Sequence, residues 1–89
     1  MARVVFTKNI QRHVTCPTMD VRGETVHEVL SAVFESNGQA RGYVLDERGA
    51  IRKHMIVFIN GKMIRDRDTL SDPVPDDAEV YVMQALSGG

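Results

Sequence analysis

The chain has 89 residues, a formal net charge of −1, 43% hydrophobic residues and 26% charged residues. This length fits one domain with its own core, and the composition is that of a soluble globular protein. The 11 basic residues are scattered along the sequence among 12 acidic ones. Phosphate binding needs a clustered basic surface, so we expect no nucleic-acid partner.

Cys16 is the only cysteine, so a disulfide-rich secreted scaffold is excluded. The first residues do not have the pattern of a signal peptide, and no stretch approaches the roughly 18 apolar residues of a membrane span. We therefore expect a cytoplasmic protein that does not bind a membrane.

The N-terminal residues predict two strands. Arg3 to Lys8 is centred on β-branched and aromatic residues, which favour a strand. Residues 10–15 alternate apolar and polar side chains, which predicts a second strand paired with the first in a hairpin. Pro17 should end that strand, since proline cannot donate to a ladder.

Residues 25–37 predict the main helix, because their apolar side chains fall on one stripe. Thr25 and Glu28 have the spacing of a capping box at the helix start. Gly38 stands where a left-handed residue often ends a helix. The stripe consists of Val26, Val29, Leu30, Val33 and Phe34.

A linker then leads to Tyr43-Val44-Leu45, and residues 46–49 have the composition of a turn. Residues 55–59 predict a strand, and Asn60-Gly61 directly after them is a strong hairpin signal, with 62–64 as the returning strand. The polar, acidic segment 65–79 is expected to be a loop. Residues 80–83 predict the last strand.

One amphipathic helix among several strands predicts an α+β domain of two layers, because the helix must bury its stripe on one face of a sheet. Topology rules favour placing the last strand beside the first, in parallel. The expected fold is a β-grasp, with a mixed sheet of four to five strands packed on one main helix. We expect this domain to span residues 1–85, followed by a flexible tail over 86–89.

Several short motifs, in this order, resemble the MoaD/ThiS family of ubiquitin-like sulfur carriers. They are Gly23-Glu24-Thr25-Val26, Val57-Phe58-Ile59-Asn60-Gly61, Glu79-Val80 and the diglycine Gly88-Gly89. The resemblance covers Val4 to Gly89. Two segments depart from it: Asp76-Asp77-Ala78-Glu79 replaces an Asp-Gly-Asp-Glu turn, and Gln84-Ala85 replaces prolines before the tail.

The resemblance implies that Gly89 is the working residue. In such proteins a ubiquitin-activating-type enzyme uses ATP to adenylate the terminal carboxylate, which becomes a thiocarboxylate, and a second enzyme accepts the sulfur. Leu86, Ser87 and Gly88 would then thread the partner's active site, where the absence of a glycine Cβ allows close approach. The chain would be a co-substrate with no catalytic residue, no bound cofactor and no metal.

A carrier must also be recognised by its partners. Strand alternation places Val57, Ile59, Val80 and Val82 toward the helix, and leaves Phe58, Tyr81 and Met83 on the opposite face. Phe58, Met83 and Leu86 could form an apolar patch beside the tail, and such patches mark protein contacts. The alternative is that loop 65–77 covers these side chains.

Other side chains are weaker candidates. Cys16 and His13 are three residues apart in a predicted strand, so they share no simple face for a nucleophile and its base. The three histidines, His13, His27 and His54, lack metal-ligand spacing. The acidic residues of 66–79 and the basic residues Arg48, Arg52 and Lys53 are more often solvated surface than binding sites.

Two other functions remain open. A protein modifier would pass the activated Gly89 to a lysine of a target, and a β-grasp binding module would have an inert tail. The sequence does not indicate which pathway would receive the sulfur.

Overall fold

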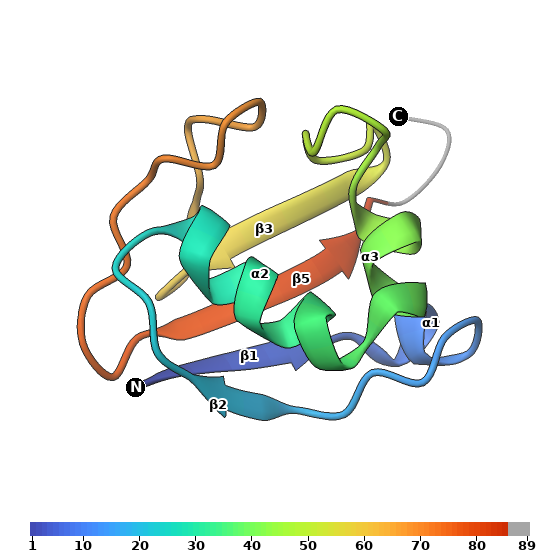
Figure 1. Ribbon diagram of the computed structural model, residues 1–89, viewed down its shortest axis with the longest axis horizontal. Coiled ribbons are helices and arrows are strands. Elements are labelled where there is room, and N and C mark those ends of the chain that lie inside the picture. The colour runs from blue at the N-terminus through green and yellow to red at the C-terminus, as the bar shows by residue number, and fades with distance from the viewer. Residues whose placement is uncertain (86–89) are drawn as a thin grey trace.

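The computed structural model describes residues 1–85, which form a five-stranded sheet with helices on one face (Figure 1). The strand order is β2-β1-β5-β3-β4, and α2 crosses the sheet as the main helix. This mixed α+β arrangement confirms the predicted β-grasp. The elements are β1 Ala2–Phe6, α1 Lys8–Gln11, β2 Met19–Val21, α2 Val26–Ser36, α3 Gly38–Val44, β3 Met55–Ile59, β4 Lys62–Met63 and β5 Glu79–Gln84.

The first and last strands pair in parallel at the centre of the sheet, as predicted. Val4 lies opposite Val80 and Phe6 opposite Val82, and all four side chains are buried. On its other side β5 pairs with β3 in the antiparallel sense. Because β5 is central, its end is surrounded by other elements.

The predicted capping box holds the start of α2. The Thr25 hydroxyl accepts the Glu28 amide at 3.2 Å, and the Glu28 carboxylate accepts the Glu24 amide at 3.0 Å. All five residues of the apolar stripe are buried. Gly23 packs against the first turn of α2. A Cβ at this position would come within 2.8 Å of Val29 Cγ2 and 2.9 Å of the Val29 amide nitrogen.

The predicted hairpin joins β3 and β4 through Asn60 and Gly61. Their φ angles are +49° and +85°, the positive values that a two-residue hairpin turn of type I′ requires. The Asn60 side chain also accepts the Glu79 amide at 2.9 Å, which ties the hairpin to the start of β5.

The predicted strand over residues 10–15 is wrong. Residues 8–11 form the short helix α1, and the strand that pairs with β1 is β2, after Pro17. Ile10 and Val14 are both buried and Arg12 is exposed. An i, i+4 pair of apolar residues fits a helical turn as well as it fits strand alternation, which explains the error.

Gly38 is not a left-handed cap, and the expected linker after it is a helix. Gly38 begins α3, whose start is capped by the Asn37 side chain accepting the Ala40 amide at 3.3 Å. Tyr43 and Val44 belong to this helix rather than to an extended segment. The predicted turn at residues 46–49 is present, with Gly49 at φ +86°.

Segment 65–78 is a loop, as predicted, and it packs beside the start of α2. Its Leu70 and Val74 are buried, and its backbone accepts the amides of Val26 and His27 at 3.0 and 2.9 Å. Within the described residues, no helix has the length and apolar character needed to cross a membrane.

Candidate functional site

The predicted site residues Leu86, Ser87, Gly88 and Gly89 lie outside the described residues. The structure describes the chain up to Ala85, immediately after the central strand β5. We call Gln84 and Ala85 the tail base, since residues 86–89 continue from there.

The tail base is held by three other segments of the chain. The Ala85 amide donates to the His54 carbonyl at 2.7 Å. The Gln84 side-chain oxygen accepts a hydrogen bond from the side-chain amide of Asn9 at 3.0 Å and one from the Tyr43 hydroxyl at 3.5 Å. The position from which residue 86 departs is therefore fixed by α1, α3 and the residues before β3.

The sheet face opposite the helices carries apolar side chains, and the predicted contact residues Phe58, Tyr81 and Met83 are among them. Phe58 lies opposite Tyr81 across the β3–β5 pair, and Ile56 lies opposite Met83. We call Val5, Ile56, Phe58, Met63, Tyr81 and Met83 the outer-face patch, because ladder pairing places them on one face.

Burial confirms the predicted alternation along both strands. Val57, Val80 and Val82 are fully buried toward the helix, and Ile59 packs partly against the core. Tyr81 keeps 39% of its surface exposed. Phe58 and Met83 are half-buried. On β5, Val80 and Val82 therefore belong to the core, whereas Tyr81 belongs to the surface.

Loop 65–77 does not cover Tyr81. Its buried side chains and backbone hydrogen bonds go to α2 and to the segment around Ile51. Met63 on the hairpin is 55% exposed and extends the outer-face patch toward the edge of the sheet. This face is open to a partner over the strands that lead to the tail base.

The acidic residues of the loop have a structural role. The Asp66 carboxylate accepts hydrogen bonds from the hydroxyl and amide groups of both Ser71 and Thr69. These bonds, with the Ser71 hydroxyl first, hold the pKa of Asp66 well below its ordinary value. Asp72 likewise accepts the amides of Arg65 and Asp66.

Cys16 and His13 do not form a catalytic pair. The Cys16 thiol is buried and donates to the Val14 carbonyl, and burial raises the pKa of this thiol. The His13 ring instead stacks on Tyr43, with ring centroids 5.6 Å apart. Among residues 1–85 there is no group of three or more His, Cys, Asp or Glu side chains placed to hold a metal ion.

Sequence reasoning missed the residues that fix the tail base. Asn9 lies between the two predicted N-terminal strands and Tyr43 follows a predicted linker, so nothing in the sequence indicated that they meet Gln84. The parallel pairing of β1 with β5 was the available signal, since it brings the residues after β1 to the end of β5.

Comparison with known proteins gives a family match. A model of the ThiS family matches residues 11–89. Comparison with curated protein sequences finds no match. Several solved structures share the fold, all at low sequence identity.

The Amycolatopsis orientalis BexX/CysO complex contains a chain that matches with a TM-score of 0.83 and 19% identity, covering 100% of both chains. CysO from Mycobacterium tuberculosis matches with a TM-score of 0.81 and 16% identity, covering 97% of this chain and 100% of that one. SAMP1 from Haloferax volcanii matches with a TM-score of 0.76 and 20% identity, over 99% and 98% of the two chains.

Proposed function

The chain belongs to the ThiS family of ubiquitin-like sulfur carriers, and we propose that it carries sulfur as a thiocarboxylate on Gly89. The observation that carries the proposal is that the family match runs through Gly88-Gly89, directly beyond a tail base fixed at the end of the central strand. The described residues supply a rigid support, and the chemistry takes place four residues further along the chain.

A free carboxylate is a poor electrophile, because attack on it must expel an oxide. In the proposed reaction a partner enzyme transfers AMP from ATP to the Gly89 carboxylate and releases pyrophosphate. A sulfur donor then attacks the acyl carbon, and AMP leaves with the electron pair of the broken C–O bond. The partner must supply the hydrogen-bond donors for the tetrahedral oxyanion, so this protein acts as substrate.

The outer-face patch is the proposed contact with the activating enzyme and with the sulfur-accepting enzyme. Tyr81 and Met83 lie on β5, which leads to the tail base. Phe58 lies on the neighbouring strand β3, whose first residue pairs with Gln84. Exposed apolar surface of this kind marks protein contacts, and aromatic residues supply much of the binding energy in such contacts.

The test is the intact mass of the purified protein after incubation with ATP, sulfide and extract from its own host. We expect a mass gain equal to the exchange of one oxygen for one sulfur. Oxidation produces the same nominal gain, so the product must also react with an alkylating agent specific for thioacids. Deletion of Gly89 should abolish the gain, whereas Arg22→Ala, at an exposed residue outside the outer-face patch, should still allow it.

A protein modifier is the second candidate, and the similarity to a structure named small archaeal modifier protein 1 favours it. In that case the activated Gly89 acylates a lysine amine of a target. The same incubation would produce conjugates of higher mass that require Gly89. A binding module with an inert tail predicts neither product, and its function would survive removal of Gly88-Gly89.

A further inference from the structure

The segments that meet the tail base are rich in basic residues. Three segments meet Gln84 and Ala85: residues 8–13, 38–43 and 52–54. Together these segments contain five lysines and arginines and neither aspartate nor glutamate. Arg41 lies on the side of α3 that faces α2, beside Glu35, so it is left out. We call the other four residues the basic collar: Lys8, Arg12, Arg52 and Lys53.

The topology gathers these charges from distant parts of the sequence. Because β1 and β5 are parallel, Lys8 and Arg12 follow β1 at the same end of the sheet as the tail base. Because β3 is antiparallel to β5, Arg52 and Lys53 precede β3 at that end as well. Figure 1 shows α1, α3 and the start of β3 grouped around the end of β5.

The collar residues are all exposed. Arg52 donates to the Gly42 carbonyl at 2.9 Å, which links the residues before β3 to α3. No ion pair found within residues 1–85 involves a collar side chain. The nearest acids in the sequence are Asp46 and Glu47, and the Asp46 carboxylate accepts the backbone amides of its own turn.

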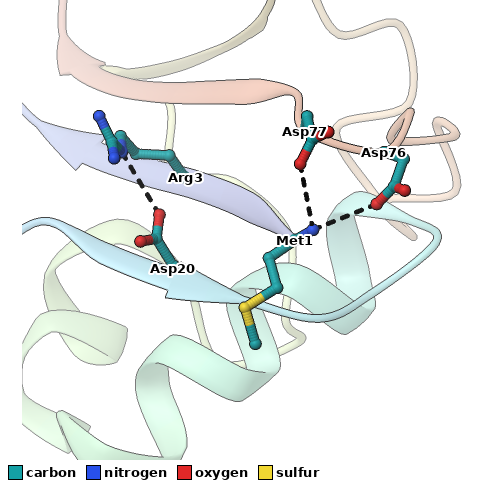
Figure 2. Close-up of polar contacts among 5 residues, drawn as sticks. All are labelled: Met1, Arg3, Asp20, Asp76 and Asp77. Carbon is teal, nitrogen blue, oxygen red and sulfur yellow. Dashed lines mark hydrogen bonds and ion pairs between the residues drawn. The ribbon is translucent and has the colours of Figure 1, made fainter.

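At the opposite end of the sheet, two cations are paired with carboxylates (Figure 2). There the amino terminus of Met1 lies 3.1 Å from Asp76 and 3.5 Å from Asp77, and Arg3 lies 3.3 Å from Asp20. The collar side chains are exposed. A net charge of −1 is therefore compatible with a local excess of positive charge near the tail base.

Any enzyme that acts on Gly89 must come close to the collar. Four residues span at most about 14 Å when fully extended. The reacting carboxylate can therefore lie no further than about that distance beyond Ala85, and electrostatic interactions extend over roughly 8–10 Å at physiological salt. The rim of any cleft that encloses residues 86–89 lies within reach of the four charges.

We infer that the basic collar steers and orients this protein onto an acidic rim around the tail-entry cleft of its activating enzyme. This inference rests on the proposed function. The outer-face patch would supply contact area, while the collar would raise the association rate and set the direction of approach, as complementary charge does in other complexes.

The arrangement favours a protein partner over a nucleic acid. The collar residues lie on segments that meet at the tail base, and Met83 of the outer-face patch directly precedes the tail base in β5. A nucleic acid would need a stripe of cations that follows its backbone, rather than a group of cations at one end of the sheet.

The experiment is ATP–pyrophosphate exchange, with the purified ubiquitin-activating-type enzyme of the host and this protein as the variable substrate. The test variant is Lys8→Glu with Lys53→Glu, because neither side chain has a hydrogen bond or ion pair within the described residues. The matched control is Arg22→Glu with Arg65→Glu, which makes the same change in net charge with exposed residues outside the collar. Thermal unfolding verifies that both variants are folded.

We expect the collar variant to raise the KM for this protein about tenfold at low salt, with kcat unchanged. The wild-type KM should rise with NaCl and meet that of the variant at high salt, while the control should follow the wild type. Equal KM values and equal salt dependence for collar variant and wild type would overturn the inference. Binding of a single-stranded RNA probe that only the collar variant loses would overturn it as well.

Failure of the proposed function gives a different result. In that case the wild type itself supports no exchange with an enzyme shown to be active on another substrate. The inference about the activating enzyme would then be rejected together with the function.

Discussion

Val82 and Tyr81 are neighbours on β5 that face opposite sides of the sheet, so their substitution separates folding from recognition. Val82 is fully buried, and Tyr81 is 39% exposed. Val82→Ala removes two methyl groups from the core, which costs about 1.6 kcal/mol of transfer free energy, or about 2–3 kcal/mol with the cavity. For a domain of this size the melting temperature should fall by about 10–20 °C.

Tyr81→Ala should have the reverse profile. It loses cross-strand contacts with Val5 and Phe58, which together contribute about 1 kcal/mol, so the melting temperature should fall by roughly 5 °C. If the outer-face patch meets the activating enzyme, the KM for this protein should rise at least tenfold, roughly the loss expected at a buried aromatic contact.

Thermal unfolding followed by circular dichroism, together with pyrophosphate exchange below the melting temperature of each variant, measures both effects. Val82→Ala should leave the KM near that of the wild type. The reasoning is refuted if Tyr81→Ala leaves the KM unchanged, or if Tyr81→Ala destabilises the protein more than Val82→Ala does.

Two further predictions concern the loops that hold α2. Gly23→Ala should destabilise the fold by roughly 1–3 kcal/mol, because a Cβ would meet the Val29 amide nitrogen at 2.9 Å and one of the two must move; urea denaturation measures this, and an unchanged midpoint would contradict the predicted clash. Asp66 has a lowered pKa in the folded protein, so its contribution to stability is present above the ordinary carboxyl pKa of about 4 and is lost as the pH falls toward the folded value. Asp66→Asn should therefore lower the melting temperature at pH 7 and reduce its dependence on pH between about 5 and 2; a pH dependence equal to that of the wild type would show that Asp66 does not contribute to it.

The elements with strong local signals were predicted well from the sequence. The capping box and apolar stripe of α2 occur as expected, because Thr25 and Glu28 satisfy amides that are exposed at any helix start. Asn60-Gly61 forms the expected hairpin, because few other residue pairs adopt two successive positive φ angles without strain. The inward and outward faces of β3 and β5 followed from alternation alone.

The errors fall where a short segment fits two periodicities. Ile10 and Val14 fit one helical turn or one strand face, and only the packing of α1 against the end of β5 decides between them. The α3 segment begins with Gly38 and has only Ala40 and Val44 as buried positions, so its helical pattern is too short to recognise. These two misread segments supply Asn9 and Tyr43 at the tail base, which is why that part of the site could not be predicted.

The grouping of basic residues near the tail base could not be predicted from the sequence for a related reason. Along the sequence, Lys8 and Lys53 are more than 40 residues apart, and acids lie between them. The parallel β1–β5 pair and the antiparallel β3–β5 pair bring the residues after β1 and those before β3 to the end of β5, while Asp76 and Asp77 lie beside the amino terminus at the other end. The strand pairing of the β-grasp fold thus also determines which charges lie near the tail base. A partner able to read this polarity could select the correct end of the molecule before residues 86–89 enter its cleft, and the salt dependence of the KM is the direct measure of that selection.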